Sequence, residues 1–361
     1  MALLLIAVVL LATANGANDL FKSTATLWGS RTVGYTGAAL CAAAGCLAGA
    51  AWAVWLPAGL LDSLRNSFIG QVLGANPSQA AAVALGAAGT VWLASRCGLP
   101  VSTTHALLGA FLGLSLACDL PFDYRFLVFN FALPLLLAPL WAMTCTAVVY
   151  RLLARWRQRL GLSPSSCVCL PHKEVFAAPC GEVACSGTCA PVVIGTLESC
   201  SEARVSVRLS APAMLATAHV FSALALGFAR SLNDVCKIGW FVLALDLPRA
   251  GVIWLTGIGI LMVGGGLVGG RRVASVMGFD ITALNTGQAF TANLLSSVTV
   301  GAASVWGWPV STTHVMCGAL FGIGAATRQA RQRAIVKIVL AWLGTVPLAA
   351  ALSALATSLL R

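Results

Sequence analysis

The stretch Gly98-Leu-Pro-Val-Ser-Thr-Thr-His105 recurs in the second half of the chain as Gly307-Trp-Pro-Val-Ser-Thr-Thr-His314. Three apolar residues and a Gly-Ala pair follow each copy, and an Asn-Asp pair precedes each copy, at Asn18-Asp19 and at Asn233-Asp234. Two motifs repeated in the same order indicate an internal duplication. The duplication therefore predicts a chain of two related halves.

The composition indicates a membrane protein. Hydrophobic residues make up 59% of 361 residues and charged residues only 9%, with a mean hydropathy of +0.89, whereas soluble domains have about a quarter charged residues. Apolar runs at 132–147, 215–227 and 251–268 suit a hydrocarbon core about 30 Å thick. Backbone groups in lipid must be satisfied internally, and the chain lacks the alternation of a barrel, so we predict an all-α polytopic membrane protein.

Each half divides into five apolar segments around a polar centre. The segments are 1–29, 35–60, 78–97, 101–118 and 124–150, then 212–246, 251–268, 280–306, 310–326 and 335–360. We predict a first transmembrane repeat at 1–150, a Cys-rich cytoplasmic linker at 151–211 and a second, inverted repeat at 212–361. Each repeat is expected to contain a broken helix and a helical hairpin.

The basic residues predict the orientation. They cluster at Arg151–Arg159, Arg271–Arg272 and Arg328–Arg333, and the net charge is +11. If 78–118 and 280–326 are hairpins that return to the side they left, every cluster lies inside, both termini lie outside, and the halves run in opposite senses. Such inverted repeats are typical of secondary transporters, with the site near the midplane. The basic residues are then expected to contact the anionic headgroups of membrane lipids and not nucleic acid. The predicted location is a bacterial inner membrane.

The N-terminal segment could be read as a secretory signal peptide, because Met1–Ala12 is apolar and is followed by small residues. It lacks a positively charged start, and cleavage near Ala14 would remove part of the polar motif that ends at Asp19. We interpret it as the first membrane span.

The duplicated motif predicts two helix N-termini inside the membrane. Proline suits the first turn of a helix and Ser or Thr suits its cap, and a free N-terminus carries unpaired N–H groups and a positive dipole end. Two opposed pockets of this kind would suit a tetrahedral oxyanion, and the duplication favours this interpretation over hydroxyls that bond back to helix carbonyls. The hydroxyl residues are Ser102, Thr103 and Thr104 in the first copy and Ser311, Thr312 and Thr313 in the second.

The two aspartates are the second signal. Asp19 and Asp234 lie in apolar segments, where ionisable residues are costly and are functional by default. The run Asn15–Asp19 interrupts its segment with small polar residues, as in the broken helix of a transport site. A carboxylate can accept a hydrogen bond from the P–OH of phosphate but finds no such donor on sulfate, which favours phosphate.

These motifs together with Arg272-Val-Ala-Ser-Val-Met-Gly278 resemble the inorganic phosphate transporter (PiT) family, over about residues 13–120 and 218–326. The resemblance implies a dimeric inverted-repeat fold with phosphate between two hairpins, driven by sodium or protons. It implies that Asn18, Asp19, Asn233 and Asp234 line the phosphate and cation sites, and that the six hydroxyl residues hold the phosphate oxygens.

The chain also departs from the family pattern. The usual Val-Ala-Asn after Asn-Asp is replaced by Leu-Phe-Lys22 and Val-Cys-Lys237, and Arg230-Ser231 stands where His-Gly is usual. Each lysine follows its aspartate by three residues and shares a helical face with it. We hypothesise that the lysines are built-in counter-cations that make transport less dependent on sodium and link it to protons. The alternative is a structural ion pair or a side chain that snorkels to the interface.

Two other features receive weaker interpretations. His105 and His314 are expected to cap or brace their hairpins and not to relay protons. The linker cysteines lack the paired C-x2-C spacing of zinc sites and face the reducing side, so a variable loop is favoured over a soft-metal or redox site. They are Cys167, Cys169, Cys180, Cys185, Cys189 and Cys200.

No enzyme signature stands out. The chain has no Walker loop, which disfavours an ATP-driven pump, and it has no Gly-x-Ser-x-Gly or His-Glu-x-x-His. We predict a secondary transporter that moves inorganic phosphate by alternating access, coupled to protons or sodium, with no other cofactor. The alternatives are a permease for sulfate or another oxyanion, an anion channel or a membrane sensor. Fixed negative charge at Asp19 and Asp234 argues against a channel for anions.

Overall fold

The structure is a computed structural model and describes residues 1–55, 76–120, 125, 128–161, 163, 166–171, 193–196, 205–243, 250–305 and 310–361. It groups them into two units, one formed by Met1–Tyr150 with His219–Arg361 and the other by Arg151–Ala218. Among the described residues five helices are long and apolar enough to cross a membrane, or six if a bent helix pair counts as one span. The predicted helical membrane protein is therefore confirmed.

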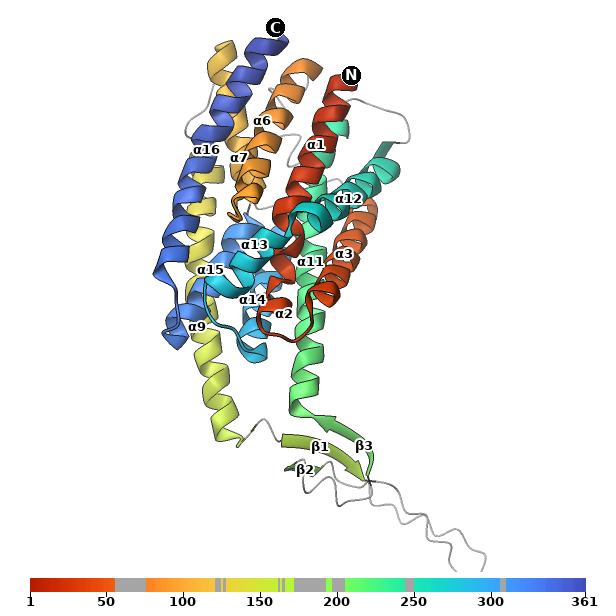
Figure 1. Ribbon diagram of the computed structural model, residues 1–361, viewed down its shortest axis with the longest axis vertical. Helices are drawn as coiled ribbons and strands as arrows, with labels where there is room; N and C mark the ends of the chain where they lie inside the picture. Colours follow the sequence, from red (N-terminus) through yellow and green to blue (C-terminus); the bar gives the residue numbers. More distant parts are fainter. Residues whose placement is uncertain are drawn as a thin grey trace, which may run out of the picture. The chain divides into compact units, whose positions relative to one another are not determined.

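The helices follow one another in a similar order in the two halves (Figure 1). Before the linker lie α1 (Ala2–Asp19), the 3-10 turn η1 (Leu20–Ser23), α2 (Ala25–Gly29), α3 (Tyr35–Trp52), η2 (Ala53–Trp55), α6 (Pro77–Arg96), α7 (Thr103–Cys118), the π-turn η3 (Val128–Ala132) and α9 (Leu133–Arg159). After it lie α11 (Ala211–Leu243), α12 (Ala250–Gly269), α13 (Arg271–Ser275), the π-turn η4 (Val276–Asp280), α14 (Thr286–Val305), α15 (Thr312–Thr327) and α16 (Gln332–Leu360).

Local sequence signals start and stop the hairpin helices. Asn76 caps α6 by accepting a hydrogen bond from the backbone N–H of Ser78, just before a proline in the first turn. Asn285 and Gln288 form a reciprocal capping box at the start of α14, which satisfies two N–H groups that the helix cannot pair itself. α7 and α15 both end at residues in the left-handed conformation, Asp119 and Arg328.

Each hairpin packs against the last helix of the opposite half. Gly109 and Gly113 of α7 lie against backbone atoms of α16, and Gly318 and Gly322 of α15 lie against backbone atoms of α9. A side chain at any of these glycines would collide with that backbone, so the small residues are what allow the close approach.

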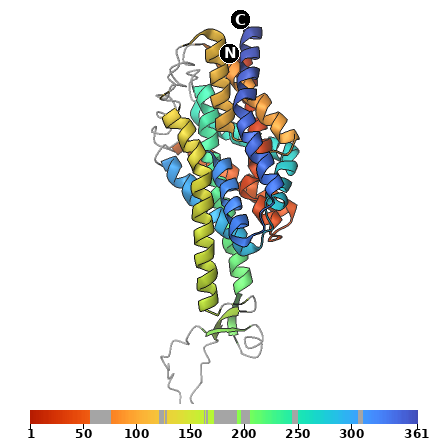
Figure 2. The same cartoon turned by 90° about the vertical axis from the view of Figure 1, so that its left-hand side faces the viewer.

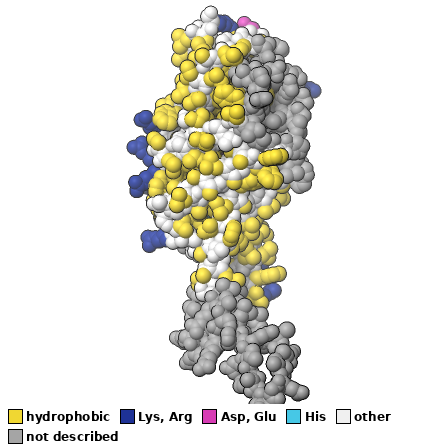
Figure 3. Space-filling view, turned by 90° about the vertical axis from the view of Figure 1, so that its right-hand side faces the viewer, with side chains coloured by type: hydrophobic (Ala, Val, Ile, Leu, Met, Phe, Trp, Pro, Cys, Tyr) yellow, Lys and Arg dark blue, Asp and Glu magenta, His cyan; other side chains and the backbone are white. Residues whose placement is uncertain are grey.

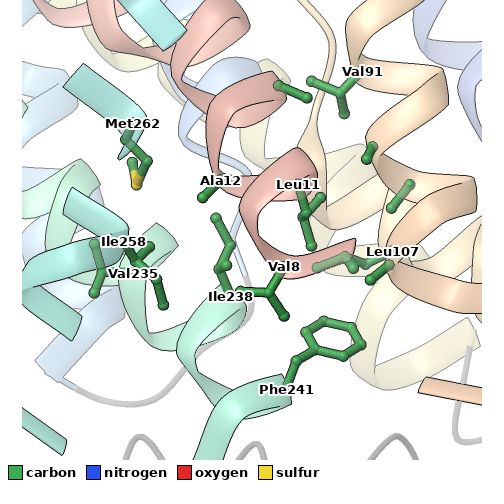
Figure 4. Packing of buried hydrophobic residues seen from close by; sticks show 14 of the residues in the cluster. Val8, Leu11, Ala12, Val91, Leu107, Val235, Ile238, Phe241, Ile258 and Met262 are labelled. Carbon is green, nitrogen blue, oxygen red and sulfur yellow. The ribbon is translucent and has the colours of Figure 1, made fainter. Parts of the chain in front are cut away.

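The remaining helices also pair across the halves. α1 meets α12 at Gly16 and Gly265, and α3 meets α11 at Gly45 and Gly49. Figure 4 shows α1 in the middle of this core, between labelled side chains of α11 and α12 on one side and of α6 and α7 on the other. This exchange of partners is compatible with two inverted copies of one unit.

Each half contains a break in a long helix, but the two breaks lie at different places in the repeats. In the first half α1 ends at Asp19, where the sequence predicts the break, and continues as a 3-10 turn, whereas α11 runs unbroken through Asn233 and Asp234 to Leu243. The second half bends instead between α12 and α13, by 71°.

The unit Arg151–Ala218 contains three strands in the segment that was predicted to be a linker loop of an all-α protein. β1 (Ser166–Pro171) pairs antiparallel with β2 (Val193–Thr196) and with β3 (Val205–Ser210), in the order β2-β1-β3. Val168 lies opposite Ile194 and Leu209. β3 alternates apolar and polar residues, the period of a strand, so the signal was in the sequence. Of the six linker cysteines, Cys180, Cys185, Cys189 and Cys200 lie outside the described residues.

The two chain ends lie at the same end of the first unit, as both views show (Figures 1 and 2). Apolar side chains spread over the helical surface in Figure 3, with Lys and Arg along the left edge and at a few other points of the outline. This fits an integral membrane protein with both termini on one side. Which side that is remains a prediction.

Candidate functional site

Lys22 forms the first half of a buried charged site. It lies one 3-10 turn after Asp19, and both side chains are about 1% exposed. The Lys22 ammonium donates hydrogen bonds to the Asp19 carboxylate, to the carbonyl oxygen of Val101 at 2.6 Å and to Oγ1 of Thr313 at 2.6 Å. Val101 lies at the tip of the first hairpin and Thr313 in the first turn of α15, so one ammonium joins both hairpin tips.

Arg230, Asp234 and Lys237 form the second half on successive turns of α11. The Arg230 guanidinium lies 3.2 Å from one carboxylate oxygen of Asp234, and the Lys237 ammonium lies 3.7 Å from the other. Lys237 also donates to Oγ1 of Thr104 at 3.0 Å. All three charged groups are buried or nearly so.

The two lysines cross over between the halves. Lys22 of the first half reaches Thr313 of the second, and Lys237 of the second half reaches Thr104 of the first. Thr104 and Thr313 hold the same place in the duplicated motif. The two sets also interact electrostatically through Asp19 and Asp234. Among the described residues the ion pairs join two carboxylates to three cations, which formally leaves one positive charge without a carboxylate.

Asparagines connect α1 to the first hairpin. The Asn15 amide donates to Asp19 and to Thr103, and the Thr103 hydroxyl also donates to Asp19. The Asn18 amide donates to Ser95 and to the Leu99 carbonyl, and its oxygen accepts from the N–H of Val101. Asn18 is therefore engaged with the hairpin backbone, as a residue that positions the tip.

The predicted hydroxyl residues divide into two kinds. Ser102 and Ser311 cap α7 and α15 by accepting hydrogen bonds from the N–H groups of His105 and His314. Thr103, Thr104 and Thr313 contact the charged groups as described above, and Thr312 is buried in the first turn of α15. Thr103 bonds to Asp19 directly, whereas Thr313 and Thr104 are linked to Asp19 and Asp234 through Lys22 and Lys237.

Arg230 is a site residue to which the sequence analysis gave no role. Its side chain is about 1% exposed, yet among the described residues its Nε and Nη2 find no hydrogen-bond partner. The neighbouring Asn233 leaves its amide nitrogen unpaired as well. A buried, unpaired charged donor costs several kcal/mol or more unless a ligand pairs with it. The signal was in the sequence: an arginine in an apolar segment, four residues before Asp234.

The two histidines brace the hairpins. Their rings lie 4.4 Å apart between centroids, and Nδ1 of His314 lies 3.2 Å from the Leu135 carbonyl oxygen. Trp342 of α16 packs on His314 with ring centroids 3.9 Å apart and donates to the Pro100 carbonyl. The hairpin tips are thereby tied to α9 and α16.

A second polar group was missed by the sequence analysis. His219 of α11 lies within hydrogen-bond distance of Thr26 and Thr32, and Asn293 of α14 contacts Thr26 and donates to the Ser23 carbonyl. These contacts tie α2 to both helices. Three or more His, Cys, Asp or Glu residues placed to hold a metal ion are not found in the described ranges.

The fold and the site together define a polytopic helical membrane protein with a buried polar site shared by two hairpins. The chain belongs to the phosphate transporter family, whose pattern matches residues 15–353. The family contains transporters and not enzymes, in agreement with the sequence analysis.

Individual relatives match parts of the chain. A Mycobacterium bovis protein named as a phosphate permease is 33% identical over 158 residues, which cover 41% of this chain and 29% of that protein. A protein of the same description from Chlamydia trachomatis is 28% identical over 339 residues, covering 75% and 77%. The match thus spans less than a third of the first relative's length. A solved structure described as a sodium-dependent phosphate transporter covers 100% of this chain and 99% of its own, with a TM-score of 0.73 and 20% identity, which establishes the shared fold.

Proposed function

We propose that this protein is a secondary transporter that binds inorganic phosphate between the two hairpin tips and moves it by alternating access. The proposal rests on the excess of buried positive charge at the site and on the donors that lack partners there. Within the part of the chain that the structure describes, three cations face two carboxylates, and Arg230 and Asn233 keep unpaired donors. An anion would supply both the missing negative charge and the missing acceptors. Family membership supports phosphate as that anion.

The lysines act as resident counter-cations in this proposal. Lys22 contacts a carboxylate, a backbone carbonyl and a hydroxyl, a set of oxygen atoms that would otherwise suit a hard metal cation. A tethered ammonium cannot leave with the substrate, but it can lose its proton when buried. Transport should therefore need little sodium and should be linked to protons.

Alternating access would require the hairpin tips to separate. Lys22 bonds to both tips and Lys237 bonds from α11 to the first, so opening toward either side breaks lysine hydrogen bonds. Phosphate bound beside the lysines would offer them replacement acceptors. The carboxylates would accept a hydrogen bond from the P–OH group of phosphate, a donor that sulfate lacks.

The test is uptake of labelled phosphate into proteoliposomes under imposed sodium or proton gradients. We expect uptake that a proton gradient drives in sodium-free buffer and that excess sulfate competes with weakly. Asp19→Asn and Asp234→Asn should abolish it, while Asp280→Asn, at an exposed aspartate, should not. Strict sodium dependence with several cations per phosphate would refute the role of the lysines. Equal competition by sulfate would reassign the substrate, and flux that neither saturates nor couples to a gradient would indicate a channel.

A further inference from the structure

A cavity outside the central site is lined by arginines. It has a volume of about 690 Å³ and lies where the C-terminal end of α6 meets the bend between α12 and α13. Arg96, Arg271 and Arg272 line it together with Ser95, Ser275 and Trp92. Arg272 and Ser275 belong to the motif at 272–278 that the central site does not use.

The charge of this cavity is uncompensated within the described chain. None of the described residues that line it is acidic, and the ion pairs found among the described residues involve only Asp19 and Asp234 with other cations. Three guanidinium groups around one cavity repel one another, and an anion bound among them would relieve that repulsion.

The arginines are held in place. Nη1 of Arg272 donates to the Arg96 carbonyl oxygen at 2.6 Å. The Arg96 guanidinium lies 5.3 Å from the ring centroid of Trp92, and that of Arg271 lies 5.2 Å from the ring centroid of Tyr35. Groups held in this way lose less entropy when they bind, and the planar guanidinium fork matches the oxygens of a phosphate group in pairs.

The cavity also borders the central site. Ser95 lines it and accepts the hydrogen bond from the Asn18 amide, and Asn18 in turn holds the N–H of Val101. Ala17, which lies beside Asn18, lines the cavity as well. A ligand in the cavity would therefore lie next to the residues that position the first hairpin tip.

We infer that this cavity is a second binding site, specific for a phosphate group. The group could belong to free inorganic phosphate on its path to or from the centre, or to the headgroup of an anionic phospholipid, and the chemistry of recognition is the same for both. The inference does not depend on the transport mechanism proposed above, because the cavity shares no charged residue with the central site.

The experiment compares three forms of the full chain. The first is the wild type, and the second is the cavity variant Arg96→Gln/Arg271→Gln/Arg272→Gln. The third is the matched control Arg155→Gln/Arg157→Gln/Arg159→Gln, which removes the same charge from exposed positions on α9. One arm measures binding of labelled phosphate to protein in neutral detergent, and the other measures retention of phosphatidylglycerol over phosphatidylcholine from mixed nanodiscs by native mass spectrometry.

We expect the cavity variant to bind its ligand at least about tenfold more weakly than the control variant in one arm, and that arm identifies the source of the phosphate group. The difference should shrink in high salt, as expected for exposed charges. The charge-preserving variant Arg96→Lys/Arg271→Lys/Arg272→Lys should fall between the two, and it replaces the glutamine variant if that variant fails to fold. Cavity and control variants that behave alike in both arms would overturn the inference. Thr103→Val/Thr313→Val, which alters only the central site, should leave the cavity site intact whether or not the protein transports phosphate.

Discussion

Replacement of Lys22 tests the central claim most directly. Lys22 holds a buried carboxylate, a carbonyl and a hydroxyl at once, and removing one partner of a buried ion pair costs about 3–5 kcal/mol. At 1.36 kcal/mol per factor of ten, this corresponds to a loss of about 150- to 5,000-fold in the population of the intact site. Both Lys22→Ala and Lys22→Met should therefore lose nearly all uptake in sodium-free buffer.

The two variants differ in what can replace the ammonium. Alanine leaves space beside the Asp19, Val101 and Thr313 oxygens, and such oxygen atoms suit a hard cation, so sodium should restore part of the uptake of Lys22→Ala. Methionine fills the space with apolar atoms, and sodium should not rescue Lys22→Met. Asp19→Asn/Lys22→Met should recover stability, because replacing both partners of a buried pair is often neutral.

The measurement is initial uptake into proteoliposomes with and without sodium, together with thermal unfolding in detergent. Lys337→Ala serves as the control because Lys337 is exposed on α16. Full uptake by Lys22→Ala without sodium would refute the reasoning, as would equal sodium rescue of Lys22→Ala and Lys22→Met.

Three further predictions concern other parts of the structure. Arg230→Lys should retain more phosphate affinity than Arg230→Gln, because it keeps the charge while losing the paired donors; KM values that do not differ between the two would argue against a role in binding. Gly113→Val should lower thermal stability by about 1–3 kcal/mol or more, since it forces α7 away from α16, while Gly344→Val, which meets open space, should have little effect. Asn285→Ala removes the capping box with Gln288 and should cost about 1 kcal/mol of stability, measured by unfolding in detergent, without changing the sodium dependence of uptake.

The general architecture could be predicted because its signals are strong and local. Composition indicates membrane helices, the duplicated motif predicts the hairpins, and Ser102 and Ser311 predict the caps that the structure contains. Asp19 and Asp234 are identifiable because a carboxylate in an apolar segment is costly.

The features that could not be predicted from the sequence depend on tertiary contacts. A sequence spacing of three residues pairs Lys22 with Asp19, but it cannot reveal that Lys22 reaches Thr313 in the other half. The unbroken course of α11 through Asn233 and Asp234 could not be predicted either, because helix propensity is only a weak guide. The alternation of apolar and polar residues in β3 was detectable, but it extends over only six residues at the end of a segment whose composition indicates a polar loop.

The crossing of Lys22 and Lys237 also constrains how this protein can evolve. A substitution at Thr104 removes a partner from a lysine that the other half encodes, and a substitution at Thr313 does the same in return. Although the halves descend from one sequence by the duplication inferred above, neither can drift independently at these positions. We expect a substitution at either threonine to be accompanied by a substitution at the lysine of the other half that contacts it.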